Sequence, residues 1–173
     1  FFSNLPYILS MDFEFAVTDT PAFSPGISIR SIYHVIADSA YDVKSNTTEK
    51  NCNIALRTFW GSGVVSTEQN PDILIQSSTL YSFRFEDIQR YRCADNHWEF
   101  WWFQYFSATD NSRKMPSAVS FQEQPGETAL MREAVKLLSS PSIHIHEESS
   151  AVISRLFSLW KTGAHRESNS THE

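Results

Sequence analysis

Residues 97–106, HWEFWWFQYF, are the most aromatic stretch of this chain. Aromatic residues favour β-strands, and successive side chains of a strand point to opposite faces of its sheet. One face of the predicted strand carries Trp98, Phe100, Trp102 and Gln104, and the other carries Trp101, Phe103 and Tyr105. Both faces are largely apolar, so we expect the strand to be covered on both sides.

These rings allow two interpretations. They are either the packed core of a barrel or, in part, the wall of a ligand cavity. Flat aromatic faces stack on the C–H faces of sugars, on bases and on cations. Several tryptophans on one strand are more than packing usually requires, which favours a ligand-binding role for some of them.

The residues before this stretch also follow a strand pattern. Runs rich in β-branched and aromatic residues occupy 27–37, 41–44, 54–60, 64–65, 73–75, 80–85 and 89–93. The sequence Gly61-Ser62-Gly63 predicts a bulge or break, residues 94–96 a hairpin turn, and residues 107–117 a polar linker. Short antiparallel strands at this spacing predict a sandwich or a barrel.

The apolar period changes after this linker. Residues 128–139 carry the stripe of an amphipathic helix, with Pro141 beyond its end. A second helix is predicted from about residue 147 to 162, with Gly163 as its stop. Its apolar residues are Val152, Ile153, Leu156, Phe157, Leu159 and Trp160. This set is wide enough either to dock entirely on the barrel or to leave a second stripe for another subunit.

Composition limits the classes of function. The chain has 173 residues, a net charge of -6 and a pI near 5.5, so it should repel a phosphate backbone. It shows neither a membrane-spanning apolar run nor a signal peptide, and we expect a cytoplasmic location. Cys52 and Cys93 are then reduced thiols; in a secreted protein they would form one disulfide.

Motifs of catalysis are missing from the sequence, which lacks nucleotide-binding glycine loops, nucleophile elbows and zinc-protease signatures. The string His144-Ile145-His146-Glu147 resembles a metal-ligand pattern, but it lies between the two predicted helices. We interpret it as a solvated helix start, with its acidic residues placed favourably in the first turn. We therefore expect no enzyme activity, no metal and no cofactor.

Three segments together resemble the N-terminal effector-binding and dimerisation domain of AraC-family bacterial transcription regulators. They are residues 60–65 (WGSGVV), 79–91 (TLYSFRFEDIQRY) and 98–105 (WEFWWFQY), within a similarity that extends over about residues 27–163. The resemblance implies a mainly β fold, a cupin-like jelly-roll barrel followed by two C-terminal amphipathic helices. It further implies an N-terminal arm and barrel over residues 1–118, a helical dimerisation region over 119–166 and a linker over 167–173.

The resemblance also implies site residues. The ligand-binding positions would be Trp60, Gln89, Tyr91, Phe100 and Trp102, with Trp102 as the sugar-stacking ring. The dimerisation positions would be Val152, Leu156, Leu159 and Trp160. Phe100 stands where the arabinose-binding relative has a polar residue, so the pocket is expected to be more apolar.

The sequence thus predicts a small-molecule sensor, with a carbohydrate as the expected effector and a homodimer as the working unit. DNA would be bound only through a C-terminal domain outside this chain, and ligand would act by ordering an arm within residues 1–23. Two alternatives stay open: a metal-dependent cupin enzyme and a stand-alone carbohydrate-binding β-sandwich.

Overall fold

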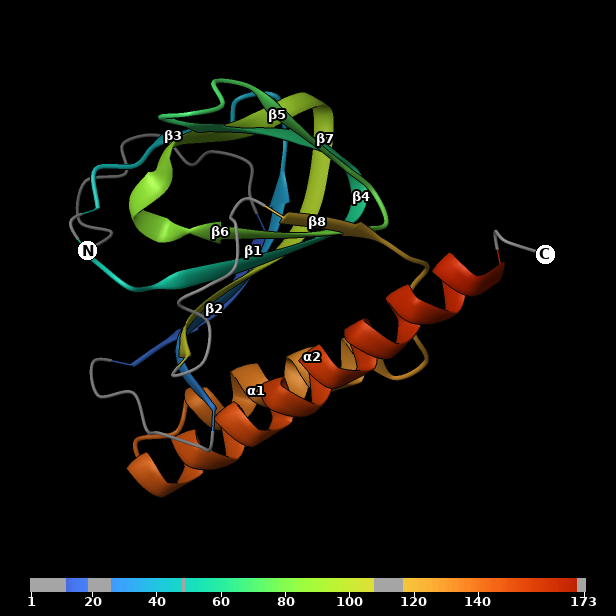
Figure 1. Cartoon of the computed structure of the whole chain (residues 1–173). Coiled ribbons are helices and arrows are strands. Elements are labelled where there is room, and N and C mark those ends of the chain that lie inside the picture. The colour runs from blue at the N-terminus through green and yellow to red at the C-terminus, as the bar shows by residue number, and fades with distance from the viewer. Residues whose placement is uncertain (1–11, 19–25, 48, 108–116, 171–173) are drawn as a thin grey trace.

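The computed structural model describes residues 12–18, 26–47, 49–107 and 117–170, which form a curled β-sheet above two helices (Figure 1). The elements are β1 (Asp12–Val17), β2 (Ile27–Ala37), β3 (Asp42–Lys44), β4 (Asn53–Thr67), β5 (Ile73–Gln76), β6 (Thr79–Arg84), a 3-10 turn (Phe85–Asp87), β7 (Ile88–Ser107), β8 (Ser117–Ser120), α1 (Glu127–Leu138) and α2 (Ile143–Ser170). The sheet runs β1-β2-β7-β4-β6-β8, with β3 on β7 and β5 on β4. All pairings are antiparallel. The predicted mainly β barrel with two C-terminal helices is confirmed.

β7 is the central strand, and its aromatic stretch is covered on both sides as expected. It pairs with β2 along one edge and with β4 along the other. Trp98, Phe100 and Trp102 belong to the cluster inside the barrel, whereas Trp101, Phe103 and Tyr105 belong to the cluster beneath the helices. The alternation predicted from the sequence is therefore confirmed.

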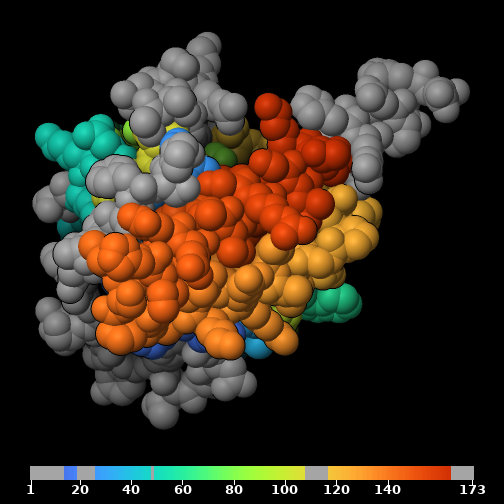
Figure 2. Space-filling view, turned by 90° about the horizontal axis from the view of Figure 1, so that it is seen from below, coloured from blue at the N-terminus to red at the C-terminus, as the bar shows by residue number. Residues whose placement is uncertain are grey.

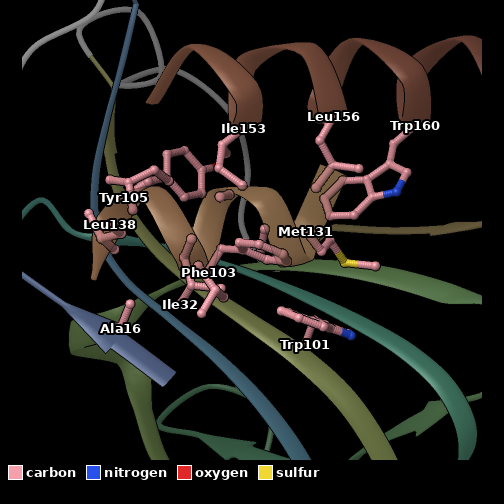
Figure 3. Packing of buried hydrophobic residues seen from close by; sticks show 14 of the residues in the cluster. Ala16, Ile32, Trp101, Phe103, Tyr105, Met131, Leu138, Ile153, Leu156 and Trp160 are labelled. Atoms are coloured by element: carbon pink, nitrogen blue, oxygen red, sulfur yellow. The ribbon is translucent and has the colours of Figure 1, made fainter. Parts of the chain in front are cut away.

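The helices lie side by side across the outer face of the sheet, α1 in amber and α2 in orange to red (Figure 2). Figure 3 shows Ile153, Leu156 and Trp160 of α2 reaching toward the rings of Phe103 and Tyr105. The Phe103 and Trp160 ring centroids are 5.6 Å apart, in an edge-to-face arrangement. This layer buries the apolar stripes of both helices.

The predicted hairpin turn at residues 94–96 is wrong, because β7 continues through it. Four residues of β7 are accommodated between the partner pairs Gly61–Trp98 and Gly63–Cys93, so the strand bulges instead of reversing. Gly63 is required here, since a Cβ would lie 2.4 Å from the Trp98 ring. The predicted linker at 107–117 contains the end of β7 and the start of β8, and its interior lies outside the described residues.

The second helix is longer than predicted. It begins at Ile143 and runs past Gly163, which is not a stop. Gly163 is buried, and a Cβ there would lie 2.7 Å from the Gln124 side chain, so the glycine serves close packing. His146 is not solvated either: it is 8% exposed, with Nε2 2.7 Å from the Ser140 carbonyl oxygen and Nδ1 3.3 Å from Thr18 Oγ1.

Two further expectations concern the cysteines and the N-terminal arm. Cys52 and Cys93 are free, buried thiols, and burial raises the pKa of Cys52 to about 12. Within the expected arm, β1 pairs with β2 as an edge strand. The remaining arm positions, 1–11 and 19–23, lie outside the described residues.

A buried ion pair joins the barrel to the helices. Arg57 of β4 and Glu127 of α1 are 1% and 0% exposed, and Arg57 Nε donates to Glu127 Oε1 over 2.6 Å. Trp160 Nε1 of α2 donates to the same oxygen over 2.7 Å, and the Gln124 backbone N–H donates to Oε2 over 2.8 Å. The guanidinium also lies 4.2 Å from the Phe121 ring centroid. One carboxylate thus connects β4, α1 and α2.

We expect Glu127→Gln to destabilise the fold by about 3–5 kcal/mol, because it leaves the Arg57 charge buried without its partner. The paired change Arg57→Met with Glu127→Leu should cost less, since no charge remains buried. The exposed Asp72→Asn, which breaks a surface contact to Arg92, should change stability little. Urea unfolding followed by circular dichroism measures all three, and equal losses in the three variants would contradict the assignment.

Candidate functional site: an aromatic barrel interior

The inner faces of β2, β4 and β7 form a continuous aromatic and aliphatic wall. β7 provides Trp98, Phe100 and Trp102, and β4 places Leu56 opposite Trp102. Phe83 of β6 closes the wall on another side. The Trp98 and Phe100 ring centroids are 4.0 Å apart. These rings are almost fully buried, so the deep part of the barrel is a packed core.

Tyrosines cover this core at the less buried end. Tyr33, Tyr41 and Tyr91 are half-buried and pack against the interior cluster. The Tyr41 ring centroid lies 6.0 Å from those of Tyr91 and Phe100. Half-buried tyrosines present both an apolar ring and a hydroxyl, which suits recognition of a small molecule with both kinds of surface.

The side chains of Tyr41 and Tyr91 interact with each other. Burial is the main cause that raises the pKa of both phenols above the usual range, because the ionised form would lose hydration. Deeper in the barrel, Trp98 Nε1 donates to Thr58 Oγ1 over 3.2 Å. The tyrosines are therefore neutral groups that can donate or accept hydrogen bonds at ordinary pH.

Three of the sequence-predicted ligand residues come together here. Tyr91, Phe100 and Trp102 all face the interior, and the Tyr91 and Trp102 ring centroids are 4.8 Å apart. Trp102 is only 4% exposed, whereas the residue Tyr91, whose ring neighbours it, is half-buried. A ligand at this end would meet Tyr91 before it meets Trp102.

Trp60 does not face the interior, contrary to the expectation. It is 68% exposed and lies opposite Glu99 on the outer face of the sheet. The pairing shifts between Thr58 and Trp60, with Phe59 as the extra residue of a bulge. One extra residue reverses the alternation, which moves Trp60 from the inner to the outer face.

Gln89 is also misplaced by the prediction, and for the same reason. The β4–β7 pairing shifts between Arg90 and Ile88, leaving Gln89 without a register partner. The residue is exposed, whereas its neighbours Ile88 and Tyr91 belong to the interior cluster. The bulge turns Gln89 out of the barrel.

The predicted dimerisation residues divide into two groups. Leu156 and Trp160 are 0% and 1% exposed because they dock on the protein's own sheet, so they are unavailable to a second subunit in this arrangement. Val152 and Leu159 are half-buried. Leu159 lines a groove of about 520 Å³ between the helices. The groove is bordered by Gln124, Pro125, Gly126, Ala129, Leu130, Glu133, Arg155, Ser158, Leu159 and Thr162.

The sequence pattern did not predict two residues at the less buried end of the barrel, Tyr33 and Tyr41. Tyr33 was placed on a strand without a role, and Tyr41 was included only as the start of a short strand. Gln104, half-buried on the inner face, was predicted to face inward and does so, since it lies opposite Ile54 of the interior. The alternation of β2 signals Tyr33, but nothing local signals Tyr41, because it reaches the cluster from a connection between strands.

The described residues contain no group of three or more His, Cys, Asp or Glu side chains placed to hold a metal ion. The His144–His146 string is not such a group, since His146 is engaged with Ser140 and Thr18. Among the described helices, none is both long and apolar enough to cross a membrane.

The comparisons with known proteins concern the fold. No family model and no curated protein matches the sequence. Among solved structures, YhaK from Escherichia coli superposes with a TM-score of 0.52 at 6% identity, over 63% of this chain and 51% of that one. The nickel(II) complex of the bacterial pirin YhhW from Escherichia coli gives 0.45 at 8% identity, over 62% and 49%.

An RmlC-like cupin from Desulfovibrio desulfuricans gives a TM-score of 0.39 at 8% identity, over 54% of this chain and 80% of that one. The chain thus spans about half the length of the YhaK and YhhW structures. The likeness to YhaK concerns the fold alone, and it agrees with the mainly β barrel that the sequence predicted.

The raised tyrosine pKa values predict how stability changes in alkali. A pKa raised on folding contributes stability that is fully present below the ordinary tyrosine pKa of 10.0. This stability is lost as the pH rises from there toward the folded-state pKa. Urea unfolding between about pH 9 and about pH 11 should show this loss, and Tyr41→Phe with Tyr91→Phe should flatten it. An unchanged slope in the double variant would show that other groups cause the loss.

Proposed function

We propose that this chain is the effector-sensing and dimerisation domain of an AraC-type transcription regulator. The observation that carries the proposal is that the two faces of β4 and β7 contact different parts of the molecule. Their inner faces bear the aromatic interior with its tyrosine end, and their outer faces hold the helices through Arg57 and Glu127. A binding wall and a reporting surface therefore share the same strands.

The effector in this proposal is a small molecule that binds at the tyrosine end of the barrel. Tyr33, Tyr41 and Tyr91 offer ring faces for apolar C–H surface and hydroxyls for polar groups. Gln104 adds an amide on the same inner face. A carbohydrate presents this combination of C–H faces and hydroxyls, and it remains the effector class we propose.

Binding would act by shifting a population of conformations. Leu56 and Thr58 of β4 contact the interior rings, and Arg57 between them reaches Glu127. A ligand that displaces β4 would change the position of α1 and α2, and with them the presentation of an attached DNA-binding domain. The acidic charge of the chain agrees with DNA contacts being made elsewhere.

The homodimer in this proposal uses the groove between α1 and α2. Glu133 lies on one wall of the groove and Arg155 on the other. In a two-fold interface, each residue of a complementary pair meets its opposite on the second copy. Leu130 and Leu159 supply apolar surface between these charges, so the groove replaces Leu156 and Trp160 as the contact.

Tryptophan fluorescence titration with a panel of mono- and disaccharides tests the barrel site. We expect one or more sugars to change the emission. Tyr91→Phe should weaken the binding of such a sugar about tenfold, because a hydrogen-bonding hydroxyl is lost. Trp102→Leu should reduce the emission change as well as the affinity.

Trp60→Phe is the matched control, since Trp60 lies outside the barrel and sugar affinity should be unchanged. No emission change with any sugar would contradict carbohydrate binding. Loss of binding in Trp60→Phe but not in Tyr91→Phe would place the sugar site outside the barrel.

Light scattering after size-exclusion chromatography tests the dimer. We expect a dimer for the unaltered chain and a monomer for Leu159→Glu, because a charge in the groove interface would stay unpaired. Leu74→Glu, an exposed leucine on β5, is the control and should stay dimeric. A monomer at all concentrations, or a dimeric Leu159→Glu variant, would contradict the proposed interface.

A further inference from the structure

The outer face of the sheet carries an exposed tryptophan beside a fixed carboxylate, away from the barrel interior. Trp60 is 68% exposed, the most exposed of the large apolar side chains described. The other four tryptophans are between 0% and 4% exposed. A tryptophan is the costliest side chain to leave in water, because its ring carries the largest apolar surface.

The backbone around Trp60 directs its side chain outward. The bulge at Phe59 turns Trp60 outward, and Gly61 follows with a φ of +71°. A Cβ at Gly61 would lie 1.9 Å from the His97 carbonyl oxygen, so only glycine allows the strands to approach this closely. The ring is therefore presented by a specific, close-packed backbone rather than by a loop.

The carboxylate partner is Glu99, which lies directly opposite Trp60 on the same face. Side chains that face each other across antiparallel strands have Cβ atoms about 4.5–5.5 Å apart. Glu99 Oε1 lies 3.0 Å from His34 Nε2, and the His34 ring stacks on buried Trp101 with centroids 4.5 Å apart and planes at 8°. The Glu99 carboxylate is thus oriented by the His34 imidazole, which is itself held by stacking on Trp101.

A second acidic side chain lies near Glu99 on this face, and the cation Arg57 of the same face is already paired with Glu127. Glu14 of β1 lies opposite His34 on the same face and is exposed, and the whole chain carries a net charge of -6. Among the described residues, no hydrogen bond engages Glu99 Oε2 or Trp60 Nε1. An aromatic face beside an acceptor carboxylate is the arrangement that binds a planar cation, which stacks on the ring and donates to the oxygen.

We propose that Trp60, Glu99 and His34 form a docking site for an arginine side chain of a basic partner segment. Trp60 takes the guanidinium face, Glu99 accepts its N–H groups, and His34 positions Glu99. A guanidinium suits the site better than an ammonium because it is planar and can both stack and donate. The site is separate from the barrel ligand, so either can fail without the other.

Nuclear magnetic resonance of the full chain tests the site with a blocked pentapeptide that has one arginine among glycines. The indole N–H signal of Trp60, assigned with Trp60→Phe, should shift saturably with this peptide. We expect the peptide that has neutral citrulline instead of arginine to bind at least about fivefold more weakly. The affinity of the peptide with lysine at this position should lie between the other two.

Glu99→Gln should weaken the binding of the arginine peptide at least about fivefold, because the negative charge of the acceptor is lost. Glu148→Gln, an exposed residue of α2, removes the same charge from the chain and should leave binding unchanged. His34→Gln should give a smaller loss than Glu99→Gln, since His34 acts through Glu99.

Any of three results with the arginine peptide would overturn the proposal. They are an absent Trp60 shift, equal binding of the arginine and citrulline peptides, and equal weakening by Glu99→Gln and Glu148→Gln. A Trp60 shift with sugars instead of the arginine peptide would also overturn it and assign this surface to carbohydrate. The indole spectrum of each variant reports whether it is folded, since the buried tryptophans give their own signals.

Discussion

The contact between Arg57 and Glu127 fixes how the barrel and the helices sit together. Both charges are fully buried, and taking them out of water costs more than an isolated attraction returns. The cost is offset by Trp160, Gln124 and the Phe121 ring, which satisfy or cover the pair. Within the part of the chain that the structure describes, one guanidinium nitrogen, Nη1, has no hydrogen-bond partner. An apolar contact would hold the layers as well, so the pair chiefly specifies where α1 begins on β4.

The sequence predicted the faces of the aromatic strand correctly because the pairing shifts along residues 98–105 of β7 have their extra residues on the partner strands, Arg30 on β2 and Phe59 on β4. Where bulges occur, alternation fails beyond them. The family resemblance assigned Trp60 and Gln89 to the ligand site, and a single extra residue on β4 or β7 places each outside the barrel. A bulge is set by the match between two strands, so it leaves little trace in the sequence of either one.

The helices show the same dependence on partners. α1 was predicted within a residue because its apolar stripe is regular and it packs on one surface only. Gly163 was misread as a stop because α2 continues through it, buried beside the Gln124 side chain, which a single sequence does not reveal. The broad apolar face of α2 suggested a second subunit, yet the sheet beneath it is wide enough to bury Leu156 and Trp160.

The arrangement of β4 explains why a sensor could use this fold. Leu56, Arg57 and Thr58 are consecutive, and they point in turn to the interior, the helices and the interior again. Backbone motion that repacks Leu56 against Trp102 must also move Arg57, because the residues share peptide planes. Arg57 follows such motion either by changing its side-chain torsions or by carrying Glu127 along through their 2.6 Å contact. A close, buried contact favours the second outcome, in which α1 and Trp160 of α2 move with the strand.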